Sequence, residues 1–175
     1  MTTPRAARPS RPAAPALPAF ESLDRAHRAA MDMLESFERL LAHLDDQGMD
    51  ETAQASAREI LAFFEGPGRT HHAEEEQHVF PGLLASSDTV LIQHVRRLQQ
   101  DHGWIEEDWR ELAPQIEAIA NGYNWYDLPM LRLALPVFTA LHRDHIALEE
   151  AIVYPAARHH LQALQEGGST RAATE

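Results

Sequence analysis

The chain has 175 residues, of which 44% are hydrophobic and 24% are charged, so it is long enough for one domain with a substantial core. Its 27 acidic and 15 basic residues leave a formal net charge of -12, which argues against a nucleic-acid partner or an anionic membrane surface. Cysteine is absent, which excludes disulfides, thiolate metal sites and a cysteine nucleophile.

The two ends of the chain differ in composition from the middle. Residues 1–19 hold five prolines and three arginines and no acidic residue, which predicts a disordered tail because such a segment buries little apolar surface. This segment lacks the apolar run of a secretory signal, and no apolar run approaches the roughly 18 residues of a membrane span. We therefore expect a cytoplasmic protein with a folded domain at 20–162 and a second flexible tail at 163–175.

Between these tails the apolar residues recur every three or four positions, which is the period of an amphipathic helix. The first two predicted helical regions run from Leu23 to near Gly48, and from Glu51 through a break at Gly66-Pro67-Gly68 and a restart near Thr70 to Pro81-Gly82. The third opens after Asp88 and closes at Asn121-Gly122, and the fourth opens at Asp127. Four such helices with short connections predict an all-α fold, an antiparallel up-down four-helix bundle.

Several polar residues interrupt these apolar stripes. His27, His102, His145 and Glu149 lie at positions that otherwise point into the core. Burying an unpaired carboxylate costs several kcal/mol, which is comparable with the stability of a whole domain. A metal ion is a suitable partner for such groups, because carboxylates and neutral imidazoles are natural metal ligands. The sequence therefore predicts a metal site in the core of the bundle.

An internal repeat supports this prediction. His71 is followed at offsets of 4, 5, 8, 9 and 10 by Glu, Glu, Val, Phe and Pro, and His145 is followed at the same offsets by Glu, Glu, Val, Tyr and Pro. His27 precedes His71 by 44 residues, and His102 precedes His145 by 43. The chain thus contains two helical hairpins, each with a lone histidine on its first helix and a His-x-x-x-Glu pair on its second. Residues four apart share a helix face, so each pair directs an imidazole and a carboxylate to one point.

Two such hairpins facing each other suit two metal ions about 3.5–4 Å apart. The six predicted ligands are His27, His71, Glu75, His102, His145 and Glu149. Two alternatives stay open, namely a register in which His72 and Glu76 replace His71 and Glu75, and Glu150 in place of Glu149. His142, one turn before His145, is either an additional ligand, a donor to a ligand, or a packed core histidine. A ferritin-like di-iron bundle is rejected, because its Glu-x-x-His spacing occurs only once, at Glu75 and His78.

The motifs that carry this pattern are His27, HHAEEEQHVFP at 71–81, QDH at 100–102 and HIALEEAIVYP at 145–155. Together they resemble the hemerythrin-like, HHE cation-binding domain family over about residues 20–160. The resemblance implies a four-helix bundle around a non-haem di-iron centre, with two oxo- or hydroxo-bridged iron ions. It places His27, His71, Glu75, His102, His145 and Glu149 on ligand positions.

Two departures from the oxygen-carrying members of this family bear on function. Those members have a fifth histidine where this chain has Leu98, and they use Asp at a five-residue spacing where this chain has Glu149 at four. A lost histidine leaves the coordination sites more open. Both features resemble hemerythrin-like domains of proteins that repair iron centres, although the cysteine pair of those proteins is absent here.

The resemblance implies a di-iron protein that binds a small ligand, namely O₂, NO or peroxide, in oxidative or nitrosative stress or in iron handling. The alternative is an O₂-binding carrier, store or sensor without turnover. The sequence leaves enzymatic activity open, since it contains no second-substrate site or nucleophile motif. We expect no nucleic acid and no membrane among the partners.

Overall fold

The computed structural model describes residues 17–172, and this part of the chain is helical without strands. The helices are α1 (Leu17–Asp46), α2 (Glu51–Glu65), α3 (Pro67–Glu74), α4 (Phe80–Leu84), α5 (Thr89–Ala120), α6 (Leu128–Leu148) and α7 (Tyr154–Ala172). Two short π-helical segments, η1 (Glu75–Val79) and η2 (Glu149–Val153), connect α3 to α4 and α6 to α7. The chain therefore forms four helical arms, which are α1, α2 to α4, α5, and α6 to α7.

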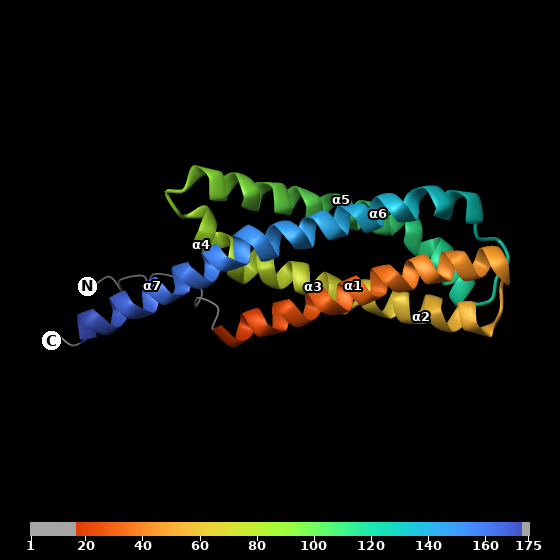
Figure 1. Cartoon of the computed structure of the whole chain (residues 1–175), viewed down its shortest axis with the longest axis horizontal. Coiled ribbons are helices and arrows are strands. Elements are labelled where there is room, and N and C mark those ends of the chain that lie inside the picture. Colours follow the sequence, from red (N-terminus) through yellow and green to blue (C-terminus); the bar gives the residue numbers. More distant parts are fainter. Residues whose placement is uncertain (1–16, 173–175) are drawn as a thin grey trace, which may run out of the picture.

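The four arms lie side by side in an elongated bundle (Figure 1). The turn between α1 and α2 and the loop between α5 and α6 lie at one end, and the link from α4 to α5 lies toward the other (Figure 1). Within residues 17–172, none of the helices combines the length and the apolar character needed to cross a bilayer. A bundle of helical arms is the architecture that the apolar periodicity predicts.

The predicted ends of α5 are confirmed, with local causes that the sequence identifies. Asp88 caps α5 by accepting hydrogen bonds from the backbone N–H groups of Val90 and Leu91, each at 3.0 Å. At the other end of α5, Gly122 has a φ of +74°. The N–H of Tyr123 bonds back to the carbonyl of Ala118 at 2.8 Å, which closes the helix in a Schellman motif.

The break between α2 and α3 is narrower than predicted. Only Gly66 separates the two helices, and α3 begins at Pro67 rather than near Thr70. Proline suits the first position of a helix because its missing N–H would have no partner there, so the helix restarts earlier.

Each predicted tail lies partly inside and partly outside the described residues 17–172. Helix α1 begins at Leu17 and so includes the last three residues of the predicted tail 1–19, and the backbone of α7 is helical to Ala172, across most of the predicted tail 163–175. Residues 1–16 and 173–175 lie outside the described part of the chain, so the flexibility predicted for them stays a prediction.

The core consists of two apolar clusters at different levels of the bundle. The larger one joins α1, α2, α5 and α6 and centres on Phe37, whose ring lies 5.4 Å from Phe64 and 5.8 Å from Phe138. The smaller one includes Leu23, Val79, Phe80, Leu98 and Tyr154. Along each arm, the buried polar residues of the repeat fall between these clusters, so a polar layer separates two apolar cores.

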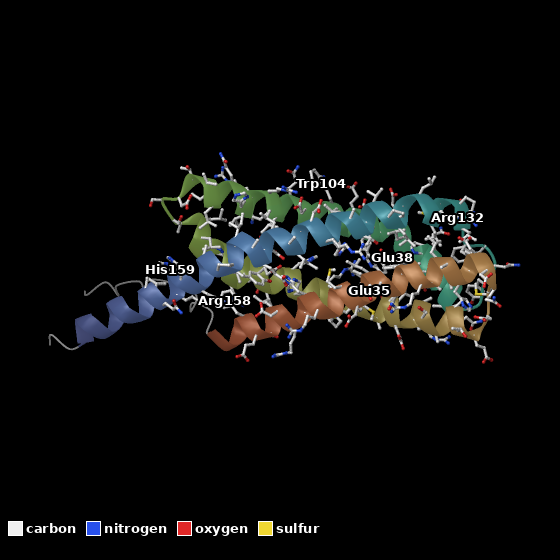
Figure 2. All side chains as sticks on the ribbon, viewed as in Figure 1. Glu35, Glu38, Trp104, Arg132, Arg158 and His159 are labelled. Carbon is white, nitrogen blue, oxygen red and sulfur yellow. The ribbon has the colours of Figure 1, made fainter. Side chains whose placement is uncertain are left out.

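Ion pairs join α1 to the last arm along its surface. Arg132 contacts Asp45, Arg143 lies 3.0 Å from Glu38, and Arg158 lies 2.7 Å from Asp24. Glu38, Arg132 and Arg158 are labelled along this side of the bundle in Figure 2. Exposed pairs of this kind each contribute no more than about 1 kcal/mol, so the apolar clusters dominate stability.

Replacing Phe37 with alanine tests this assignment of the core. Phe37 is completely buried, so we expect Phe37→Ala to lower the free energy of unfolding by about 3–5 kcal/mol through lost burial and an unfilled cavity. Leu133→Ala is the control, because Leu133 is 78% exposed, and its effect should stay within about 0.5 kcal/mol. Urea denaturation followed by circular dichroism measures both. Equal effects of the two substitutions would contradict the assignment.

Candidate metal centre

The polar layer contains a compact set of six buried side chains, which we call the histidine–glutamate cluster. Its members come from α1, α3, η1, α5, α6 and η2, and each is at most 8% exposed. They are His27, His71, Glu75, His102, His145 and Glu149, the six residues that the repeat predicts as ligands. The structure thus brings all six to one place, although they lie as far apart as residues 27 and 149 in the sequence.

The six side chains form two overlapping groups of four. In one group, potential ligand atoms of His27, His71, Glu75 and Glu149 lie within 4.8 Å of one another. In the other, atoms of Glu75, His102, His145 and Glu149 do the same. The two glutamates belong to both groups, so each group has two imidazoles of its own and shares two carboxylates with the other.

The carboxylates lie between imidazoles of opposite hairpins. Oε2 of Glu149 is 3.1 Å from Nε2 of His27, and Oε1 of Glu149 is 3.2 Å from Nε2 of His145. Oε2 of Glu75 is 3.6 Å from Nε2 of His71 and 3.4 Å from Nε2 of His102. All four histidines therefore direct Nε2 toward the carboxylates.

Several atoms of the cluster are buried without a hydrogen-bond partner among the described residues. They include both ring nitrogens of His71, Oε2 of Glu75 and both carboxylate oxygens of Glu149. A buried acceptor without a donor costs about 1–3 kcal/mol, and more when it is charged. Cations bound between the two hairpins would satisfy these oxygens and nitrogens together, so the residues present fit a metal centre.

Each repeat also contains a second glutamate, and these two residues lie outside the cluster. Oε1 of Glu150 is 3.1 Å from Nδ1 of His27, and Oε1 of Glu76 is 3.1 Å from Nδ1 of His102. Each carboxylate thus accepts a hydrogen bond from the lone histidine of the opposite hairpin. Such a bond fixes the tautomer and leaves Nε2 as the free donor atom.

These positions bear on the alternatives that the sequence leaves open. His71 and Glu75 point into the cluster, whereas Glu76 contacts the outer nitrogen of His102. Likewise Glu149 points into the cluster, and Glu150 contacts the outer nitrogen of His27. The sequence did not predict that Glu76 and Glu150 contact the outer nitrogens of His102 and His27. The signal that could have indicated it is the Glu-Glu pair, which occurs at equal offsets in both repeats.

His142 has a different environment. Its Nδ1 is 3.1 Å from the carbonyl oxygen of Phe138 and donates a hydrogen bond to it. Its ring packs against Phe138 at 4.3 Å and Phe64 at 5.5 Å. His142 thus belongs to the edge of the larger apolar cluster, which is the packed-histidine alternative of the sequence analysis.

An aromatic ring covers one histidine on each side of the cluster. Tyr154 stacks on His27 with ring centroids 5.0 Å apart, and Phe80, its counterpart in the repeat, stacks on His102 at 5.6 Å. The Tyr154 hydroxyl also donates a hydrogen bond to Glu75 and lies 3.1 Å from Nε2 of His27. The two rings lie at the same offset in the repeat, but their contact with the histidines was not predicted.

The π-helical segments position the glutamates. η1 begins at Glu75 and η2 at Glu149, and the N–H of Phe80 and of Tyr154 bonds back five residues to the carbonyl of that glutamate. A proline lies two residues after the last residue of each segment, at Pro81 and Pro155, and proline cannot donate to the helical hydrogen bonds. Wider π turns of this kind occur frequently at functional sites.

Burial and mutual contact set the charge states of the cluster. Burial lowers the pKa of His71 to about 4, so its imidazole is neutral at pH 7. Burial and the negative charge of Glu75 raise the pKa of Glu149 to about 8. Burial lowers the pKa of His27, but its contact with Glu149 outweighs this, and the net pKa is raised.

Comparison with known proteins identifies the family. The hemerythrin HHE cation-binding domain matches residues 19–157, which is most of the chain. The chain belongs to this family. The hemerythrin HHE domain covers all six residues of the histidine–glutamate cluster and both π-helical segments. Membership in a cation-binding family and the buried donor set agree on metal binding.

One curated relative of this hemerythrin-like chain is an uncharacterized protein of Haemophilus influenzae. The two are 24% identical over 110 residues, which is 63% of this chain and 62% of the relative. The match therefore spans less than two thirds of the relative's length. No solved structure matches the chain.

The raised pKa of Glu149 predicts a pH-dependent stability of the metal-free hemerythrin-like chain. Between the ordinary carboxyl pKa of 4.5 and the folded value of about 8, the folded state binds more protons than the unfolded state. The free energy of unfolding should therefore fall as pH rises through this window, by up to about 1.4 kcal/mol per pH unit. His27, whose pKa is also raised, contributes with the same sign.

Glu149→Gln removes this titration, so the stability of the variant relative to wild type should increase steadily from pH 5 to pH 8. Urea denaturation in the presence of a chelator measures both curves. Glu74→Gln is the control, because Glu74 is exposed and should leave the curve unchanged. Parallel curves for Glu149→Gln and wild type would contradict the charge state assigned to this residue.

Proposed function

We propose that the chain binds two iron ions in the histidine–glutamate cluster and that a small ligand, O₂, NO or peroxide, reaches them. The observation that carries the proposal is the pair of four-donor groups that share Glu75 and Glu149. In this proposal one ion is held by His27 and His71, the other by His102 and His145, and both glutamates bridge them. We take the four arms to form an antiparallel up-down bundle. Its first hairpin contributes His27 and His71, and its second hairpin contributes His102 and His145.

The donor chemistry supports iron. Imidazole and carboxylate suit iron among the divalent transition metals, and the cluster contains no thiolate that would favour a softer ion. Two iron ions with vacant coordination positions would supply redox change and binding of a small ligand. The chain's own residues supply neutral imidazoles, carboxylates between the two positions and a water-poor surrounding.

The outer carboxylates support a stable metal-binding geometry. Glu150 and Glu76 hold Nδ1 of His27 and of His102, so these rings keep Nε2 directed at the cluster. Asp101, which is 1% exposed, lies 3.8 Å from Nδ1 of His145 and adds a negative charge beside that ring. Three of the four imidazoles thus have a carboxylate on their outer side.

A cavity beside the cluster supports access for a small ligand. It reaches His71 and Ile146 at its inner end, and Arg69 and Glu106 line it near the surface. Arg69 and Glu106 form a two-pronged ion pair at 2.7 and 3.1 Å that joins α3 to α5. Ala30, Ile105 and Trp109 make the walls largely apolar, which favours a small neutral ligand over a large polar substrate.

Metal loading tests the proposed ligands. We expect His71→Ala and Glu149→Ala each to lower the amount of bound iron and the metal-dependent rise in melting temperature together, because metal binding and folding are linked. Elemental analysis of the reconstituted protein and calorimetry with and without iron measure the two effects. His78→Ala is the control, because His78 is exposed on the neighbouring π-helical segment. Two irons per chain in either variant would remove that residue from the ligand set.

The ion pair in the cavity lining predicts the rate of ligand entry. We expect Arg69→Ala to accelerate azide binding to the iron-loaded protein several-fold without changing the amount of iron, because it removes a long side chain that lines the cavity. Arg110→Ala is the matched control, since Arg110 lies 3.8 Å from the same Glu106 and does not line the cavity. Stopped-flow absorbance measures the rates. Equal rates in wild type and Arg69→Ala would mean that azide enters by another route.

Reversible binding and redox turnover would use the same site, and air exposure of the reduced, iron-loaded protein separates them. A reversible change of the optical spectrum supports a carrier, store or sensor. Rapid irreversible oxidation, together with consumption of NO or release of iron to an acceptor, supports a role in stress defence or iron handling.

A further inference from the structure

Tyr154 is a buried residue whose polar end reaches the histidine–glutamate cluster. It is completely buried and begins α7, directly after η2. It belongs to the second repeat, five residues after Glu149, yet its hydroxyl donates a hydrogen bond to Oε1 of Glu75 in the first repeat. The hydroxyl oxygen also lies 3.1 Å from Nε2 of His27 on α1. This one hydroxyl therefore connects three arms of the bundle.

The two oxygens of Glu75 have different surroundings. Oε1 accepts the hydrogen bond from Tyr154, whereas Oε2 has no hydrogen-bond partner among the described residues. Oε2 lies 3.6 Å from Nε2 of His71 and 3.4 Å from Nε2 of His102, so it faces one imidazole of each hairpin. Holding Oε1 restricts rotation of the carboxylate about its last bond. The hydrogen bond from Tyr154 thus sets the direction in which Glu75 presents its free oxygen.

This hydrogen bond leaves Glu75 able to bind cations. Each carboxylate oxygen has two lone pairs, so Oε1 can accept a hydrogen bond with one and bind a cation with the other. Hydrogen bonds from neighbouring groups to metal-binding carboxylates orient these ligands and support the metal site. The contact between Tyr154 and Glu75 is therefore compatible with a bridging role of Glu75.

The ring of Tyr154 is fixed from several sides, so its hydroxyl has a defined place. The ring stacks on His27 with 9° between the planes, and it meets Phe20 edge-on at 5.8 Å. The guanidinium of Arg158 lies 5.9 Å from the ring centroid, and Arg158 donates hydrogen bonds to both carboxylate oxygens of Asp24, at 2.8 and 2.7 Å. These contacts do not involve the hydroxyl, so a phenylalanine would keep them.

The repeat supplies an internal comparison. Phe80 takes the place of Tyr154 in the first repeat and stacks on His102 at 5.6 Å, but it has no hydroxyl. By the symmetry of the repeat its target would be Glu149, and both carboxylate oxygens of Glu149 lack a hydrogen-bond partner among the described residues. One glutamate of the cluster thus has a tyrosine donor, and the other has none.

We propose that Tyr154 is a positioning residue, whose hydroxyl holds Oε1 of Glu75 and keeps Oε2 directed between the imidazoles of the two hairpins. The inference rests on the proposed two-metal function, in which Glu75 bridges the two ions. Tyr154 orients Glu75 before a metal binds, whereas Glu149 takes its bridging orientation from the ions themselves.

Tyr154→Phe in the full-length chain removes the hydroxyl and keeps the ring contacts. We expect competition with a chelator for Fe(II), without oxygen, to show about 10- to 100-fold weaker iron binding in the variant, the range found when a residue that supports a metal ligand is lost. Tyr123→Phe is the matched control, because it removes the hydroxyl of an exposed tyrosine between α5 and α6. Its iron affinity should equal that of wild type.

The metal-free chain gives a readout that a packing role of the ring would not affect. The infrared difference spectrum between wild type and Tyr154→Phe should contain a shifted carboxylate stretching band, because Glu75 loses its donor. The melting temperature of Tyr154→Phe should fall for the same reason. In a Glu75→Ala background the same substitution should produce neither the band nor the fall, because the two residues act as a pair.

Three results would each overturn this inference and leave the two-metal function intact. The first is unchanged iron affinity in Tyr154→Phe. The second is an equal fall in melting temperature with and without Glu75, which would assign the effect to packing. The third is a tyrosinate-to-iron charge-transfer band in the oxidised wild type that Tyr154→Phe lacks, which would make Tyr154 itself a ligand. A wild-type chain that takes up no iron overturns the proposed function and, with it, the role of Tyr154.

Discussion

Two carboxylates, Glu75 and Glu149, lie fully buried in the middle of the bundle without enough donors for their oxygens. Burying such groups costs several kcal/mol each, which is a large part of the stability of a domain of this size. Helix backbone groups are already bonded to one another and cannot relieve this cost. The polar layer is therefore the part of the structure that a bound cation would stabilise, and an apolar cluster lies on either side of it.

The internal repeat places both buried glutamates, Glu75 and Glu149, in the same local structure. Each half places a histidine and a glutamate one turn apart, widens the helix from the glutamate onward and has a proline two residues after the wide turn. The adjacent glutamate of each half then crosses to the lone histidine of the other half, at His27 or His102. Because each hairpin completes the other, neither half holds a finished set of donors alone.

Differences between the halves make the cluster asymmetric. Tyr154 brings a hydroxyl to His27, whereas Phe80 covers His102 with a purely apolar ring. His72 stands beside the second hairpin's histidines, and Ile146 occupies its place in the other half. A two-fold repeat supplies the same donor types twice, and differences at neighbouring positions give the two groups of donors different surroundings.

The sequence alone predicted the helical arms, both ends of α5 and the histidine–glutamate pattern of each repeat, because helical period, capping residues and repeat offsets are local properties. Tertiary structure decided how the remaining polar residues are used. The offsets treat Glu75 and Glu76 alike, and likewise His71 and His72, but a helix turns by 100° per residue. Which of two neighbours faces the cluster therefore depends on how that helix is rotated against the others. Packing of four arms sets this rotation, and it places Glu76 and Glu150 behind histidines from distant parts of the chain.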